Sequence, residues 1–325
     1  MIRREFLIGS AIMAGGAGRI WGQSPDKAKL DRIAIMSTCF SSILKSPLYP
    51  DDPKRTLDVM DLPDMYAKHY GVHDVEMQHA HFLSTEPAYL KEFRARVAKA
   101  GSRMNQINLE FGLLNISATD AVLRMETIDL SKQWIDHAVA LGCPRVMANQ
   151  GTLAPDVRQA AIATLKAIVE YGKTKKVFVT MENRGGGGGG RGAVARGGAG
   201  APGTPAAAGA PAGAAAQAAP PGRGPGATWE VVVEVLKAAG GYANPDVGNF
   251  PDEEARHAGL RVMYAMSSGS SHCHFSPERY SEADAIKISK EVGYKGLFSI
   301  EAGAANGPDP YTAVQNVLSE LLKDI

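Results

Sequence analysis

Acidic or imidazole side chains stand at the ends of four short, mostly uncharged segments in the second half of the chain. Glu182 ends the segment 177–182, Asp246 ends 242–246, and Glu301 ends 296–301. His272 ends the segment 264–272, with His274 two residues beyond it. Carboxylate oxygens and imidazole nitrogens are common ligands of divalent metal ions. If the segments are parallel strands of one barrel, their carboxyl ends meet on one face. The pattern therefore predicts a metal site there.

The chemistry that such a site predicts is proton transfer at a carbon beside a carbonyl group. In sugar isomerisation and epimerisation, a divalent metal across two adjacent oxygens stabilises the enediolate, while carboxylates on opposite sides supply the base and the acid. We predict Glu182 and Glu301 as this acid/base pair because they end the fifth and eighth strands. Asp246 and His272 complete the predicted coordination sphere.

The nitrogen ligand is uncertain because two histidines stand close together, as His272, Cys273 and His274. We expect only one of the two imidazoles to point inward and favour His272, with His274 as the alternative ligand. Cys273 is predicted to be a packed thiol.

Further polar residues near the predicted strand ends are candidates for binding sugar hydroxyls. Glu76, His79 and His81 belong to the second strand and its end. Bonding within the barrel rim explains these three residues equally well, and a second metal at the two histidines is a further alternative. The predicted substrate-binding set is Glu76, His79, His81, Asn149, Asn183, Asn249 and His274.

Eight alternations of strand and helix are predicted from the apolar periodicity. Strands are expected at 32–38, 72–78, 103–109, 145–149, 177–182, 242–246, 264–272 and 296–301. Helices are expected at about 62–70, 86–100, 118–141, 155–171, 228–236, 252–262, 281–292 and 310–322. Regular alternation predicts parallel strands with helical crossovers, and the count of eight favours a (β/α)8 TIM barrel, in the α/β class, over an open sheet.

The bulk composition is that of one large domain without a polyanion partner. Of the 325 residues, 45% are hydrophobic, and the formal net charge is +1. The basic residues are spread along the chain, which disfavours nucleic acid as a partner. The three cysteines, Cys39, Cys143 and Cys273, are odd in number and far apart, so no disulfide framework is expected.

Residues 1–24 resemble a twin-arginine export signal. Arg3 and Arg4 precede an apolar run at 6–18 that is rich in Gly and Ala and too short for a permanent membrane span. We expect export by the twin-arginine machinery to the periplasm, with the barrel at 25–325. No stable membrane insertion is expected.

The segment 185–227 consists almost entirely of Gly, Ala and Pro with a few Arg. It has too little apolar side chain to offset the entropy of ordering, so a disordered low-complexity loop inside the barrel is predicted after the fifth strand. Passive expansion of the sequence is favoured over a mobile cover for the site.

Several motifs resemble the xylose isomerase-like TIM barrel superfamily, the sugar phosphate isomerase/epimerase family. They are Glu182-Asn183, the segment 245–250, the segment 299–303 and the predicted helix around 129–142. The resemblance extends from about residue 32 to the end of the chain. It implies one divalent ion, Mn, Mg, Co or Zn, bound by Glu182, Asp246, His272 and Glu301.

The chain departs from these relatives at two positions. Asn249 stands where ketose epimerases of the superfamily usually carry a histidine, and His274 stands where many relatives carry a lysine. The first departure argues against a standard free-ketose 3-epimerase. The second leaves the partner of any substrate phosphate or carboxylate unassigned.

The leading function is therefore a metal-dependent isomerase or epimerase acting on a small sugar or sugar derivative. A lyase or hydrolase of 3-keto-glycosides would use the same site. An endonuclease IV-type phosphodiesterase would need more metal ligands and a basic surface for DNA, and a non-catalytic binding barrel would need no metal. The oligomeric state, including a homo-oligomer, is left open.

Overall fold

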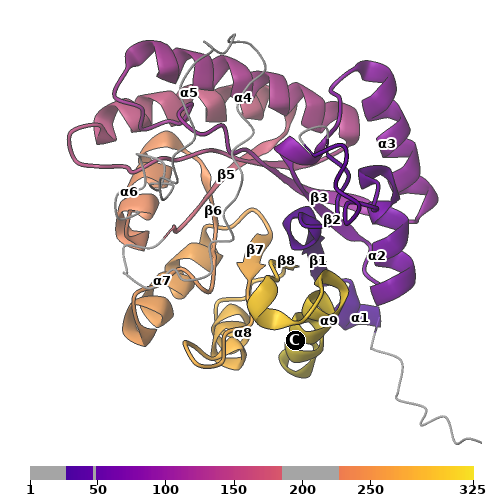
Figure 1. Cartoon of the computed structure of the whole chain (residues 1–325). Helices are drawn as coiled ribbons and strands as arrows, with labels where there is room; N and C mark the ends of the chain where they lie inside the picture. Colours follow the sequence, from indigo (N-terminus) through magenta and orange to yellow (C-terminus); the bar gives the residue numbers. More distant parts are fainter. Residues whose placement is uncertain (1–26, 47–48, 185–226) are drawn as a thin grey trace, which may run out of the picture.

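The computed structural model describes residues 27–46, 49–184 and 227–325. The predicted export signal and the low-complexity segment, except its last residue Ala227, lie outside these described residues. Strands and helices alternate along the described chain, and Figure 1 shows the helices as a ring around the strands.

The strands are β1 (Ile33–Met36), β2 (Asp74–Gln78), β3 (Arg103–Asn108), β4 (Arg145–Met147), β5 (Phe178–Glu182), β6 (Tyr242–Asn244), β7 (Ser270–Cys273) and β8 (Leu297–Ile300). The helices are α1 (Lys27–Leu30), α2 (Leu62–Tyr70), α3 (Pro87–Lys99), α4 (Ala121–Leu141), α5 (Arg158–Lys175), α6 (Trp229–Ala239), α7 (Glu253–Ala265), α8 (Glu282–Glu291) and α9 (Pro310–Asp324). Short 3-10 turns are formed by Ser37–Phe40, Val59–Asp61, His79–His81 and Ala304–Asn306. None of the described helices is both long enough and apolar enough to span a membrane.

The eight strands form one parallel sheet in the order β6-β5-β4-β3-β2-β1-β8-β7. The two end strands of this order, β6 and β7, are linked by isolated bridges, Ala243 with Ser267 and Asp246 with His272. His272 N also donates to Pro245 O at 2.8 Å, and Val247 N donates to His272 O at 3.1 Å. The sheet is thus a nearly closed barrel, which confirms the predicted (β/α)8 architecture.

Apolar side chains at helical and strand spacing form the core between the helices and the barrel. On α6, for example, Val232, Val235 and Leu236 are buried because they share one face of the helix. On β1, Ile33 and Ile35 are completely buried. This layer holds the strands in place and thereby fixes the positions of their carboxyl ends.

A β-bulge interrupts the pairing of β2 with β3. Val75 pairs with Met104, but Glu76 pairs with Gln106, so Asn105 is the extra residue. As a consequence, the adjacent side chains of Asn105 and Gln106 both donate to Glu76, at 2.8 Å and 3.2 Å. The barrel interior is therefore polar at this level.

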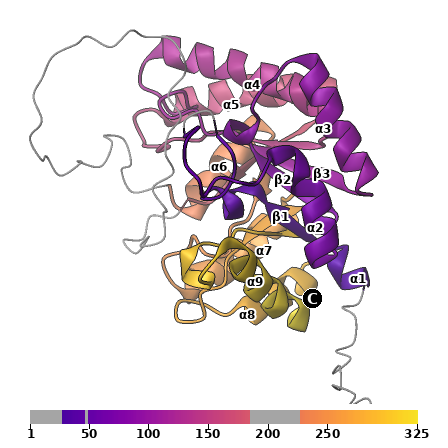
Figure 2. The same ribbon diagram turned by 45° about the vertical axis from the view of Figure 1, so that its right-hand side comes forward.

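The first and last described helices lie side by side. Figure 2 shows α1 near the end of α9, and Lys29 Nζ donates to Leu322 O at 2.6 Å. Helix α1 was not predicted from the sequence because it spans only four residues.

The largest error in the predicted elements concerns the segment 264–272. Helix α7 continues to Ala265, and β7 begins only at Ser270. Leu260, Met263 and Tyr264 are all buried, so the apolar face of the helix runs past the predicted boundary. The predicted start of a helix at residue 155 was also too early, because α5 begins at Arg158 after a turn.

Candidate metal centre

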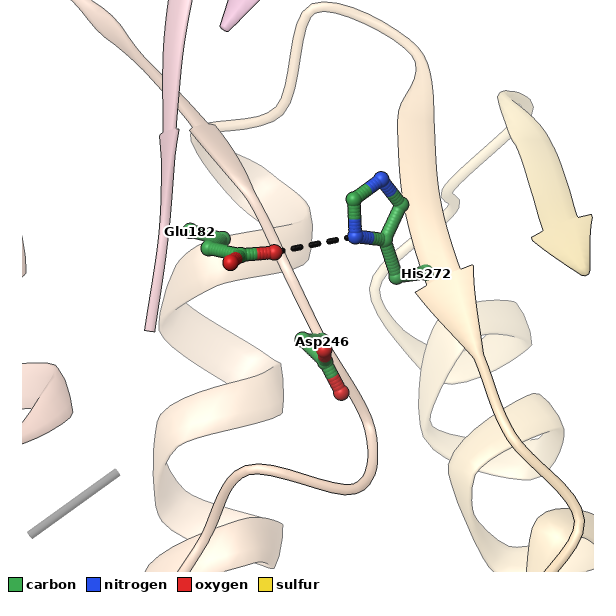
Figure 3. Close-up of side chains that lie close together, drawn as sticks. All are labelled: Glu182, Asp246 and His272. Atoms are coloured by element: carbon green, nitrogen blue, oxygen red, sulfur yellow. Dashed lines mark hydrogen bonds and ion pairs between the residues drawn. The ribbon is translucent and has the colours of Figure 1, made fainter. Parts of the chain in front are cut away.

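Three of the predicted ligands converge at the carboxyl ends of neighbouring strands. Glu182 is the last residue of β5, Asp246 follows β6, and His272 lies on β7. Each offers one ligand atom, and these atoms lie within 4.8 Å of one another. Figure 3 shows the carboxylate of Glu182 directed at the imidazole of His272, with Asp246 on the loop beside them. All three residues are buried.

Glu301 reaches the same imidazole from the end of β8. Oε2 of Glu182 lies 2.9 Å from Nδ1 of His272, and Oε2 of Glu301 lies 3.6 Å from that nitrogen. The two glutamates predicted to act together therefore both approach the same imidazole nitrogen.

A second group of possible ligands overlaps the first and consists of Asp246, His274 and Glu301. Nε2 of His274 lies 3.1 Å from Asp246 Oδ2 and 3.8 Å from Glu301 Oε2. The expectation that only one of His272 and His274 points inward was wrong, because residues two apart share one face of an extended segment. Cys273 between them is buried as a free thiol, and burial raises its pKa well above the ordinary value.

The loop after β6 is built to hold the carboxylate of Asp246. Gly248 N donates to Oδ1 at 2.8 Å, and Asn249 Nδ2 donates to Oδ2 at 2.7 Å. Asn183 bonds both the backbone N and the backbone O of Asp246, at 2.8 Å and 3.0 Å. The side chains of Asn183 and Asn249 thus support a ligand residue.

The charges of the centre favour a cation. Burial by itself would lower the pKa of His272, but the carboxylates of Glu76 and Glu182 raise it well above its ordinary value. Burial likewise opposes a proton on His274, yet Asp246 and Glu301 raise the pKa of that imidazole to about 9. The donor set of buried carboxylates and imidazoles, with negative charge in excess, therefore fits a divalent metal ion.

Arg184 pairs with the oxygen of Glu182 that does not face His272. Its Nε lies 2.7 Å from Glu182 Oε1, and its Nη2 donates to Glu110 Oε1 at 2.9 Å. Neither Arg184 nor Glu110 was among the predicted site residues. For Arg184 the signal was its position two residues after Glu182, at the end of the same strand.

Glu76 lies inside the barrel and not at its mouth. The residue has no exposed surface, and its Oε1 lies 2.7 Å from His272 Nε2. Burial alone would raise the pKa of Glu76, but the imidazole of His272 lowers it below the ordinary value. Glu76 therefore contacts a candidate ligand, and its burial leaves no surface for a sugar.

Three other predicted substrate-binding residues, His79, His81 and Asn149, make contacts outside the ligand group. The ring of His79 packs edge-on against Phe111 and Trp134, with centroids 4.7 Å and 5.5 Å away. His81 Nδ1 is 2.8 Å from Ser37 Oγ. Asn149 Nδ2 donates to Leu114 O at 3.0 Å and so holds the loop after β3.

Three amides on β3 take part in the centre indirectly and were not predicted. Asn105, Gln106 and Asn108 all donate to the carboxylate of Glu76. The sequence does contain a sign of their role, since three amide side chains fall within four residues of one strand. This cluster breaks the alternation of polar and apolar side chains expected of a strand.

Comparisons with known proteins agree with this architecture. Residues 65–193 match the family model described as xylose isomerase-like TIM barrel. No curated protein matches the sequence significantly.

Solved structures of several sugar-converting enzymes have a similar fold. D-allulose 3-epimerase from Methylomonas sp. is 10% identical, with a TM-score of 0.63 over 90% of this chain and 98% of that chain. D-psicose 3-epimerase from Clostridium cellulolyticum is 10% identical, with a TM-score of 0.62 over 89% and 96%. A sugar phosphate isomerase/epimerase from Parabacteroides distasonis is 13% identical, with a TM-score of 0.56 over 89% and 93%. Residues 65–193 are thus similar to the xylose isomerase-like TIM barrel family, and the eight-stranded parallel barrel of the described chain agrees with that similarity.

Proposed function

We propose that this protein is a metal-dependent isomerase or epimerase of a small sugar or sugar derivative. The observation that carries the proposal is the convergence of Glu182, Asp246, His272 and Glu301 at the carboxyl ends of β5 to β8. The names of the structural neighbours, which are sugar epimerases and isomerases, support the same class of reaction.

The cofactor we propose is one divalent ion, Mn, Mg, Co or Zn, held by these four residues. When bound, it would polarise the sugar oxygens and offset the negative charge that develops during proton transfer. His272 is the preferred nitrogen ligand because it contacts both Glu182 and Glu301, whereas His274 contacts Asp246 and Glu301.

The acid and the base of the proposed reaction are Glu182 and Glu301. One carboxylate accepts the proton from the carbon beside the carbonyl group, and the other, in its protonated form, returns a proton to the neighbouring carbon or to the opposite face. Arg184 holds Oε1 of Glu182 and so keeps Oε2 directed toward the centre. Burial of Glu182, with 6% of its surface exposed, limits exchange of the transferred proton with water.

The proposal is tested by incubating the protein with Mn²⁺ and a panel of aldoses, ketoses and keto-sugars. Isomer or epimer products are expected, and Glu182→Gln should reduce their rate of formation by about 10²- to 10⁴-fold because the variant lacks the ionisable group. Glu170→Gln, the same change at an exposed position of α5, is the matched control. Full activity and full metal content in Glu182→Gln would contradict the proposed roles.

The alternatives give different results in the same experiment. Release of a sugar from a 3-keto-glycoside, without isomerisation of free sugars, would identify a lyase or hydrolase. Metal content by mass spectrometry separates the remaining classes: about one equivalent supports an isomerase, several point to an endonuclease IV-type enzyme, and none to a non-catalytic barrel.

We also propose that the protein is exported by the twin-arginine machinery and works in the periplasm. The support is the pair Arg3-Arg4 followed by the apolar run at 6–18. Cell fractionation of wild type and of an Arg3→Lys, Arg4→Lys variant tests this, since loss of the pair should retain the protein in the cytoplasm.

A further inference from the structure

The completely buried carboxylate of Glu76 is bonded by four nitrogen atoms from two other strands, β3 and β7. Asn105 Nδ2 lies 2.8 Å from Oε2, while Asn108 Nδ2 at 2.8 Å, Gln106 Nε2 at 3.2 Å and His272 Nε2 at 2.7 Å meet Oε1. The amide nitrogens can only donate, and a carboxylate bonded in this way only accepts. Nε2 of His272 therefore carries a proton that it donates to Glu76.

The orientation of the Asn105 amide is fixed by an independent contact. Its Oδ1 lies 3.1 Å from Nη1 of Arg145, and a guanidinium has donors but no acceptor. Arg145 is itself held in place because Ser268 O accepts from its Nε at 3.0 Å and from its Nη2 at 2.7 Å. The amide cannot be turned round, so its NH₂ group must face Glu76.

The other nitrogen of the imidazole consequently faces the candidate metal centre. Nδ1 of His272 is the atom that lies 2.9 Å from Glu182 and 3.6 Å from Glu301. Metal-binding histidines often donate their second N–H to a buried carboxylate, which fixes both the tautomer and the angle of the ring. Resting on the proposed function, we propose that Glu76 is a positioning residue that keeps Nε2 protonated and thereby makes Nδ1 of His272 the ligating atom.

The bulge in β3 is what gives Glu76 enough donors for this role. In a regular strand, Asn105 and Gln106 would point to opposite faces of the sheet. The extra residue brings both amides to the same carboxylate. The geometry of a ligand on β7 thus depends on β2 and β3, across the barrel interior.

The first test measures the tautomer in the wild-type protein loaded with Zn²⁺. Long-range ¹H–¹⁵N NMR of histidine-labelled protein, with the signals of His272 assigned by their loss in His272→Gln, is expected to show Nε2 protonated and Nδ1 bound to the metal. The opposite arrangement, with Nε2 bound, would overturn the proposal.

The second test is the affinity of Glu76→Gln for Mn²⁺, measured by isothermal titration calorimetry. The Kd is expected to rise about 10- to 100-fold, the range typical for loss of an outer partner of a histidine ligand. The matched control is Asp74→Asn, which changes another buried carboxylate of β2 that pairs with Arg103. This control is expected to keep the wild-type Kd.

The outcomes separate this inference from the proposed function. A wild-type Kd in folded Glu76→Gln would overturn the role of Glu76 and leave the proposed function standing. Metal binding with no turnover of any sugar would overturn the proposed function alone, and a wild type that binds no divalent ion would overturn both. If Glu76→Gln does not fold, the NMR experiment on the wild type decides the question.

Discussion

At the scale of single residues, two histidines of this protein are expected to carry different charges because different groups surround them. His79 lies among aromatic rings, and burial lowers its pKa to about 4. His272 lies between carboxylates, which raise its pKa well above the ordinary value despite burial. The imidazole of His79 is therefore expected to be neutral, whereas that of His272 is expected to hold an extra proton and a positive charge.

We expect His79 to make the protein less stable in acid. Its pKa in the folded state lies below the ordinary 6.5, so the unfolded chain binds the extra proton first as the pH falls. Stability should be lost between about pH 6.5 and 4, by a contribution on the order of 3 kcal/mol. Urea unfolding of wild type and His79→Gln across this range measures the effect. Equal pH slopes in the two proteins would contradict it.

The sequence allowed prediction of the candidate ligands but not of their supporting residues. Glu182 and Glu301 are recognisable because each is a lone charged residue at the end of an apolar run. The role of Glu76 was not predictable, because its partner His272 is 196 residues away in the chain. Such a contact depends on how the strands are arranged around the barrel.

At the scale of elements, a helix or strand boundary could be predicted where a particular residue, such as a glycine, marks it in the sequence. Helix α2 has the predicted bounds 62–70, and Gly71 ends it with φ at 69°, a left-handed conformation that glycine adopts without strain. The end of α7 was predicted too early because the helix and its apolar face continue past residue 262, with Met263 and Tyr264 buried. The bulge in β3 was not predictable, since a bulge is defined by pairing with another strand.

The close packing of α7 against its neighbours gives a prediction at this scale. A Cβ atom on Gly259 would clash with Phe250 Cε1 and lie 3.0 Å from Trp229 Cδ2. Gly259→Ala should destabilise the fold by about 1–3 kcal/mol through overpacking, although alanine has the higher helix propensity.

Chemical denaturation measures this change, with Gly303→Ala as the control. A Cβ atom on Gly303 would meet no described atom within 4 Å, so that variant should unfold like the wild type. A stabilised Gly259→Ala protein would show that Phe250 and Trp229 can move aside at little cost.

At the scale of the whole molecule, the regular alternation of elements was sufficient to predict the barrel. Eight parallel strands with helical crossovers are present as expected. The alternation of strands and helices does not show which two neighbouring strands of the barrel pair least extensively. The identity of that pair, β6 and β7, depends on the tilt and offset of strands, which leave little local trace in a sequence.

Binding of a divalent ion should stabilise the whole barrel. A ligand that binds only the folded state raises the unfolding free energy, by about 2.7 kcal/mol at 100 times its Kd. The melting temperature is expected to rise with Mn²⁺ concentration in the wild type, and to respond much less in Asp246→Asn. An unchanged melting temperature in wild type at saturating Mn²⁺ would contradict a site confined to the folded state.

Because β6 and β7 are paired only by isolated bridges, the candidate ligands would also affect how firmly the barrel is closed. Asp246 and His272 stand on either side of this junction and are themselves one of its isolated bridges. An ion bound by both residues would link β6 to β7 and so close the barrel. Opening of the barrel at this junction would then also release the ion. Amide hydrogen exchange at Val247 and His272, whose N–H groups cross the junction, should therefore slow more than elsewhere when the ion binds.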